Sequence, residues 1–112
     1  MRDRSNSRNI KLAMESAFAN AVYEYLLTIP KGRVITYAKL ADAIGHPGAA
    51  RAVGNVLHKN PDPDRYPCYK VVNSKGELAR NFALGIDEQR KRLERDGVIV
   101  KENRVDLDKY KI

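Results

Sequence analysis

Two short helical patterns lie on either side of residues 45–48, which read Gly-His-Pro-Gly, and this feature constrains the fold most. Thr36 is a favoured N-cap residue, so a first helix is expected after it, up to about Ile44. A second helix is expected from about Ala49 to Leu57. Two short helices joined by a tight turn that contains glycine are typical of a helix-turn-helix. The sequence therefore predicts a small domain built around such a helix pair.

The second of these helices carries one arginine among small side chains. Ala50, Ala52 and Gly54 leave the helix surface nearly bare around Arg51. Such a surface can approach another surface closely, and the arginine can reach into whatever the helix approaches. The alternative is a helix that packs tightly on its own core with Arg51 in solvent. The helix alone leaves both interpretations open.

One further helix is expected on each side of this pair. Apolar residues recur every three or four positions from Met14 to Ile29, which is typical of an amphipathic helix. Pro30 ends that helix, because proline lacks a backbone N–H and cannot continue the hydrogen-bonded ladder. Residues 86–96 have helical composition, and Gly97 suits the position just after the last turn.

Short strands complete the expected fold. Residues 33–35 and 71–72 are strand candidates, and residues 98–100 and 105–107 predict a C-terminal β-hairpin. We therefore expect a mainly α fold with short β elements, similar to a winged helix-turn-helix.

Length and charge narrow the function classes. The 112 residues fit one domain, 1–112. Residues 1–11 are polar and basic, which predicts a flexible basic tail rather than a secretory signal.

A formal net charge of +7 favours a polyanionic partner, nucleic acid before membrane, although a generic basic protein has the same charge. No apolar run approaches the roughly 20 residues that span a bilayer, so we expect a cytoplasmic protein without a membrane partner.

Cys68 is the only cysteine, so it forms no internal disulfide and no cysteine-rich zinc site. His46 and His58 lie twelve positions apart on a polar stretch, and we expect no metal site. A lone cysteine is most often a small buried apolar residue. Here Pro67 stiffens the chain before it, and Lys70 follows closely; a nearby cation lowers the pKa of a thiol and makes it reactive.

Four motifs follow one another along the chain: Thr36-Tyr37, Ala49-Ala50-Arg51-Ala52-Val53-Gly54, Asn60-Pro61 and Pro67-Cys68-Tyr69-Lys70-Val71-Val72. In this order and spacing they resemble the C-terminal domain of the O6-alkylguanine-DNA alkyltransferases and of the related alkyltransferase-like proteins. The similarity extends from about residue 17 to residue 97, and the chain resembles the single-domain members of the family. The resemblance implies a DNA-binding domain that acts on double-stranded DNA from the minor groove.

The resemblance implies a role for each matching residue. Cys68 falls on the alkyl acceptor, and Arg51 falls on the finger that fills the gap left by a flipped base. Tyr37 falls on the tyrosine that crowds the target phosphate and helps to rotate the nucleotide. Asn60 falls on the asparagine that braces the loop before the cysteine.

The same resemblance implies a base pocket and a close approach to DNA. Pro63 and Phe82 fall on pocket-wall positions, and Ala83 on a residue whose backbone N–H faces the base O6. Ala50 and Gly54 are the small residues that allow the helix to enter the minor groove.

Two positions depart from the family pattern, which reads Pro-Cys-His-Arg. Tyr69 replaces the histidine that relays the thiol proton, and Asp96 falls on the position of the glutamate behind it. A phenol is a poor base at neutral pH, but it can still donate a hydrogen bond to water or to the sulfur. Lys70 replaces the arginine as an expected DNA contact and loses its bidentate fork.

Three functions follow as hypotheses. In the first, a monomer flips O6-alkylguanine from duplex DNA and transfers the alkyl group irreversibly to Cys68, once per molecule, with no cofactor or metal ion. In the second, a non-catalytic sensor binds the flipped base and recruits downstream repair proteins. In the third, a winged-helix regulator reads operator sequence and Cys68 is structural. We favour the first, because a cysteine at the acceptor position is chemically specific.

Overall fold

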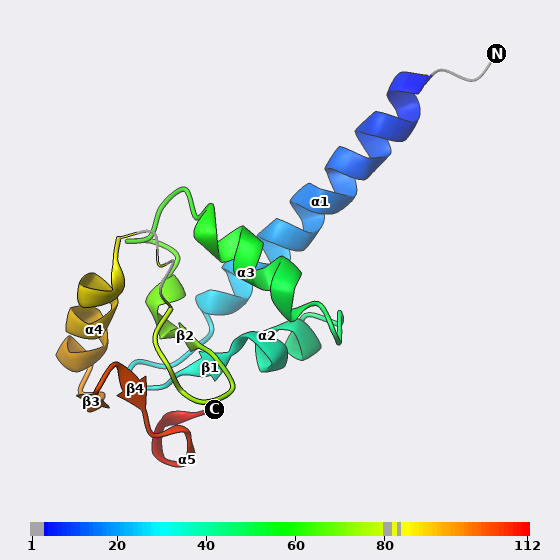
Figure 1. Ribbon diagram of the computed structural model, residues 1–112. Coiled ribbons are helices and arrows are strands. Elements are labelled where there is room, and N and C mark those ends of the chain that lie inside the picture. Colours follow the sequence, from blue (N-terminus) through cyan, green and yellow to red (C-terminus); the bar gives the residue numbers. More distant parts are fainter. Residues whose placement is uncertain (1–3, 80–81, 83) are drawn as a thin grey trace.

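The structure is a computed structural model that describes residues 4–79, 82 and 84–112, with side-chain environments from residue 14 onward. Figure 1 shows α1 extending away from a compact body formed by the other elements. In chain order the elements are α1 (Arg4–Leu26), β1 (Ile35–Thr36), α2 (Tyr37–Ala43), α3 (Ala50–His58), the 3₁₀ helix η1 (Cys68–Lys70), β2 (Val71–Val72), α4 (Ile86–Arg95), β3 (Val100–Lys101), β4 (Arg104–Val105) and α5 (Leu107–Tyr110).

A parallel strand pair joins the two halves of the body. In β1 and β2, Ile35 pairs with Val71 and Thr36 with Val72. The chain enters α2 directly after β1, and Cys68 lies three residues before β2. This pairing therefore brings the start of α2 beside the cysteine segment, although they are far apart in the sequence.

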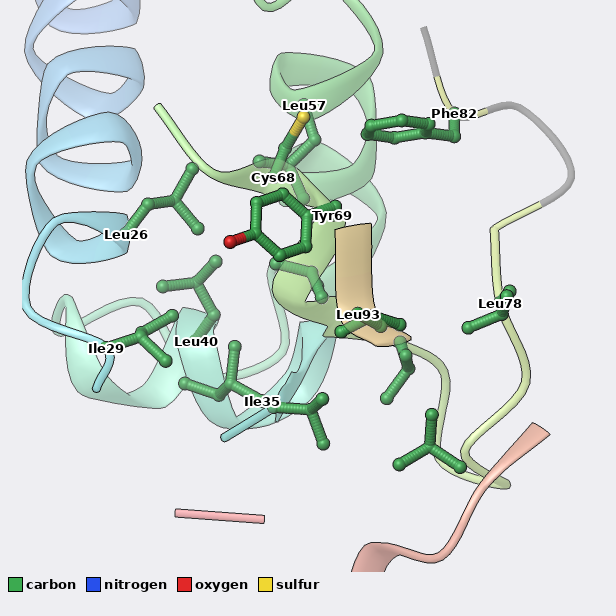
Figure 2. Packing of buried hydrophobic residues seen from close by; sticks show 14 of the residues in the cluster. Leu26, Ile29, Ile35, Leu40, Leu57, Cys68, Tyr69, Leu78, Phe82 and Leu93 are labelled. Atoms are coloured by element: carbon green, nitrogen blue, oxygen red, sulfur yellow. The ribbon is translucent and has the colours of Figure 1, made fainter. Parts of the chain in front are cut away.

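Apolar side chains from every part of the body form one core around this strand pair, as Figure 2 shows. The last turns of α1 and the residues after it contribute Leu26 and Ile29, α2 contributes Leu40, and α4 contributes Leu93. Burial of such side chains is the main favourable term in folding. The core fixes the relative positions of α2, α3 and η1.

The expected fold class is confirmed: short strands accompany five α-helices and one 3₁₀ helix among the described residues. Thr36 caps α2 as expected, since its hydroxyl accepts a hydrogen bond from the backbone N–H of Lys39 at 3.2 Å. The predicted second helix is α3. The predicted C-terminal hairpin is present as the antiparallel pair β3–β4, in which Val100 pairs with Val105.

The structure differs from expectation at both ends of the chain. The α1 helix already begins at Arg4, so most of the expected tail has helical backbone; its flexibility stays a prediction. Met14 is 68% exposed rather than part of the core, because α1 extends beyond the body. Part of the expected strand at 105–107 is instead the start of α5, which Asp106 caps. No described helix, α1 included, is long and apolar enough to cross a membrane.

Candidate active site

A cavity of about 620 Å³ lies between α3 and the segment that follows β2, and Cys68 is part of its wall. Six of the residues singled out in the sequence line it: Tyr37, Ala50, Arg51, Gly54, Cys68 and Phe82. Asn55, Asn73 and Glu77 add polar groups that the sequence did not indicate. Among the described residues, no three His, Cys, Asp or Glu side chains gather in a way that could hold a metal ion.

Cys68 is held by its own backbone and by the strand that follows. It is the first residue of η1, and its N–H donates to the carbonyl oxygen of Tyr66 at 2.7 Å. Its side chain is only 4% exposed, and burial raises the pKa of the thiol above its ordinary value. Hydrogen bonding from the Asn60 side chain and the charge of Arg92 act in the opposite direction. The thiol is therefore protonated at neutral pH, and a thiolate must form during reaction.

Asn60 links the end of α3 to the cysteine segment. Its Nδ2 donates to the carbonyl oxygen of Tyr66 at 2.9 Å, and its Oδ1 accepts from the N–H of Asp62 at 3.0 Å. Tyr66 is the same residue whose carbonyl accepts from Cys68. The buried amide thus fixes both ends of the proline-containing loop before the cysteine, which is the geometry of a brace.

Tyr69 is bonded to Asp96 and not to the sulfur. Its hydroxyl donates to Oδ2 of Asp96 at 2.6 Å. In Figure 2 the Tyr69 hydroxyl and the Cys68 sulfur point in different directions. Burial, followed by the bond to Asp96 and its charge, raises the pKa of Tyr69. A phenol has one O–H, so Tyr69 donates no hydrogen bond to the thiol and stays protonated at neutral pH.

Lys70 lies inside the body, although the sequence predicts that it contacts DNA. Its side chain is 7% exposed, and Nζ donates to the carbonyl oxygen of Ile29 at 2.8 Å. The physical reason is the turn of η1, which directs this side chain into the body toward carbonyls just beyond the end of α1. Such carbonyls lack helical partners and favour a cation. Burial lowers the pKa of Lys70, and the charge of Asp96 opposes that shift.

Tyr37 and α3 form one edge of the cavity. A methyl group added at Gly54 would lie 3.9 Å from Cε1 of Tyr37, so the ring lies against the helix where a side chain is missing. Burial raises the pKa of Tyr37, and Cys68 adds to this shift. Arg51 is exposed on the same helix and lines the same cavity. The structure thus brings Tyr37, Arg51 and Cys68 together from three separate segments.

Only part of the expected base pocket is found around this cavity. Phe82 lines it and is 9% exposed. Pro63 is not part of its lining: the carbonyl oxygen of Pro63 accepts from Nη1 of Arg92 on α4 at 3.3 Å, and its role as a pocket wall stays a prediction. Ala83 lies outside the described residues.

Gln89 is a positioning residue that sequence reasoning missed. Its side chain is fully buried on α4, and its Nε2 donates to the carbonyls of Tyr69 and Val71, each at 3.1 Å. Its Oε1 accepts from the N–H of Ala79, in the cavity wall, at 2.8 Å. One amide therefore joins α4, the cysteine segment and the cavity wall. Its place between Ile86 and Leu93 on the apolar face of the helix was the available signal.

Arg92 also holds the cysteine loop against α4. It forms ion pairs with Asp64 at 2.8 Å and with Glu88 at 3.1 Å. Because Asp64 belongs to the loop before Cys68, this pair links that loop to α4. The positive charge of Arg92 also acts to lower the pKa of the Cys68 thiol.

Known proteins resemble this chain over the elements that form the cavity. Residues 17–98 match the family described as 6-O-methylguanine DNA methyltransferase, DNA binding domain. A bifunctional methyltransferase/endonuclease of Picrophilus torridus is 46% identical over 90 residues, which make up 80% of this chain and 30% of that protein. A DNA base-flipping protein of Vibrio parahaemolyticus is 36% identical over 95 residues, 84% of this chain and 94% of that protein.

A solved structure gives the same result. S. pombe Atl1, in complex with damaged DNA containing O6-carboxymethylguanine, matches with a TM-score of 0.80 at 30% identity, over 87% of this chain and 95% of that one. The chain spans 30% of the length of the Picrophilus protein. The matched region holds α2, α3 and Cys68, and the resemblance based on the four motifs is confirmed. This chain belongs to the 6-O-methylguanine DNA methyltransferase DNA-binding-domain family.

Proposed function

We propose that this protein extrudes O6-alkylguanine from duplex DNA into the cavity and transfers the alkyl group to Cys68. The observation that carries the proposal is the position of Cys68 in the wall of a 620 Å³ cavity, with Arg51 and Tyr37 beside it. That volume lies within the range of about 300–1,000 Å³ that is usual for small-ligand sites. A family assignment that includes methyltransferases supports the same chemistry.

Base extrusion explains the composition of α3. A base inside a stacked duplex is sterically blocked, so chemistry on it requires that the nucleotide be rotated out. Ala50 and Gly54 let the helix approach the minor groove closely, and Arg51 occupies the space that the base leaves. The minor groove carries little sequence information, which suits a protein that acts at any position. Binding then rests largely on phosphate contacts and weakens with salt.

The transfer is a single displacement. The sulfur of Cys68 attacks the alkyl carbon, an S–C bond forms, and the bond from that carbon to O6 breaks. The electron pair of the broken bond stays on the guanine, which takes up one proton, while the thiol has lost one. The products are a thioether and unmodified guanine, so one molecule acts once.

A second candidate function rests on the Tyr69–Asp96 pair. The single O–H of Tyr69 is already donated to Asp96, so this phenol gives the thiol no hydrogen bond. The raised pKa of Cys68 also keeps the thiol protonated. Both features favour a protein that flips and holds the alkylated base without transfer. The Vibrio relative is named a DNA base-flipping protein, which fits the flipping step of this candidate.

Intact-protein mass after incubation with a duplex that contains O6-methylguanine separates the two candidates. The proposal predicts the gain of one methyl group in the native protein and none in Cys68→Ser. Lesion-selective binding without any gain in mass, at every time and protein concentration, leaves only the second candidate. Absence of both mass gain and lesion-selective binding contradicts both.

A further inference from the structure

A second hollow, of about 550 Å³, lies on the C-terminal part of the molecule, between the β3–β4 hairpin and α5. Four basic side chains line it: Lys75, Lys101, Arg104 and Lys109. Two carboxylates, Asp106 and Asp108, also belong to its lining, so its formal charge is positive. None of these residues belongs to the cavity that contains Cys68.

The basic groups of this hollow differ from those of α4 in how they are paired. On α4, Arg90, Arg92 and Arg95 each lie within 4 Å of a carboxylate oxygen. Within the described residues, none of the four basic side chains of the hollow forms such a pair; the one recorded contact, of Lys109, is with the ring of Tyr110. Their charge is therefore available to an external anion.

The hollow adjoins the Cys68 cavity through a single loop. Asn73 and Glu77 line the cavity, while Lys75, between them in the sequence, lines the hollow. The N–H of Val105 donates to the carbonyl of Gly76 at 2.8 Å. A methyl group at Gly76 would collide with the carbonyl oxygen of Val105, so the hairpin lies directly against the loop.

A second backbone bond fixes the tip of the hairpin to the cavity wall. The N–H of Leu78 donates to the carbonyl of Asn103 at 2.9 Å, and Leu78 lines the cavity. Glu102 and Asn103, with φ of 53° and 57°, form the tight turn that allows this approach. These backbone bonds hold the basic hairpin against the wall of the cavity.

We propose that this basic hollow holds the phosphate backbone of the same duplex, beside the nucleotide that enters the Cys68 cavity. The inference rests on the proposed DNA binding, but not on alkyl transfer. Duplex DNA carries one negative charge per about 1.7 Å along its axis, so a duplex seated over the cavity continues as a polyanion past the adjoining loop. A short acidic peptide would occupy only the hollow, so the position of the hollow next to the cavity would have no role in binding it.

Salt dependence of binding to an undamaged duplex of about two helical turns tests the proposal. Lys101→Gln/Arg104→Gln removes two of the phosphate contacts, so the slope of log affinity against log salt concentration should fall by about 2. Lys31→Gln/Lys91→Gln is the matched control, because both lysines are exposed, lie outside both hollows and change the net charge equally. The control should retain the native slope. Lys75→Gln/Lys109→Gln should repeat the fall without altering the hairpin strands.

An unchanged slope in both test variants, or an equal fall in the control, overturns the proposal. Binding of a glutamate-rich peptide that is lost in Lys101→Gln/Arg104→Gln, with an unchanged slope on DNA, assigns the hollow to a protein partner and also overturns it. The outcome is separate from the chemistry at Cys68. If the test variants keep the native slope while the native protein gains a methyl group on Cys68, only the role of the hollow is contradicted. If the slope falls in the test variants while the native protein gains no methyl group, only the alkyl transfer is contradicted.

Discussion

The hydroxyl of Tyr69 donates its single hydrogen to the carboxylate of Asp96 at 2.6 Å. The family resemblance implies a histidine and a carboxylate that relay the thiol proton at these two positions. An imidazole at the same place has two ring nitrogens, so it can bond to a carboxylate with one and serve the thiol with the other. A phenol that donates to Asp96 can only accept from a second partner. Asp96 is therefore bonded to a phenol at the place where the resemblance implies an imidazole.

Tyr69→His is expected to raise the single-turnover rate of alkyl transfer. Restored general-base assistance should give a gain near the lower end of its usual range, roughly 10- to 100-fold. Asp96→Asn should lower the rate more in the Tyr69→His protein than in the native one, because only the imidazole needs the carboxylate. The measurement is a two-by-two comparison of single-turnover rates at fixed salt. Equal or lower activity in Tyr69→His would show that the site is built around the phenol.

The reactivity of Cys68 toward a small alkylating reagent should rise with pH through a midpoint above that of an ordinary cysteine. Burial disfavours the thiolate and raises the pKa of the folded thiol, so the thiolate forms later than in the unfolded chain. The raised pKa also contributes to the stability of the fold at pH values below the ordinary thiol pKa. That contribution is lost as the pH rises through the pKa of the folded thiol. The control is the denatured protein. A reactivity midpoint of the native protein at or below that of the denatured protein would contradict a raised pKa of Cys68.

Arg51→Ala should reduce base extrusion more than it reduces total affinity for DNA. The substitution removes the group that occupies the vacated stack, while the rest of the basic surface remains. A fluorescent adenine analogue beside the lesion reports extrusion, and anisotropy of the same duplex reports affinity. Tyr37→Phe, which keeps the ring against Gly54, should have the smaller effect. An intact extrusion signal in Arg51→Ala would rule out its role as the finger.

Gln89→Leu should lower the free energy of unfolding by about 2–4 kcal/mol, because it leaves two buried carbonyls and the half-buried N–H of Ala79 without this partner. Urea denaturation measures the change, and an unchanged m-value confirms that the unfolded state is the same. Lys91→Ala, exposed on the same helix, should change it by less than about 0.5 kcal/mol. A loss no larger than that of the control would show that Gln89 does not hold the cavity wall.

Local patterns predicted the helices well, and their limits are physical. Thr36 caps α2 because capping depends on a few neighbouring residues. Met14 fits the apolar repeat of α1, but burial depends on whether the rest of the body reaches it. Lys70 looked like a surface cation, whereas the turn of η1 buries it beneath Ile29, a contact across 41 residues. Gln89 was overlooked for the same reason: its three partners are set by tertiary structure.

Cys68 as alkyl acceptor is tested most directly by peptide mapping after single-turnover reaction with duplex DNA that contains O6-methylguanine. The account predicts one methyl group per protein molecule, located on Cys68, and an equal amount of unmodified guanine in the DNA. It also predicts no further methyl group when fresh substrate is added, since the thioether does not release it. A methyl group on any other residue, or intact O6-methylguanine bound to an unmodified protein at saturation, would contradict it.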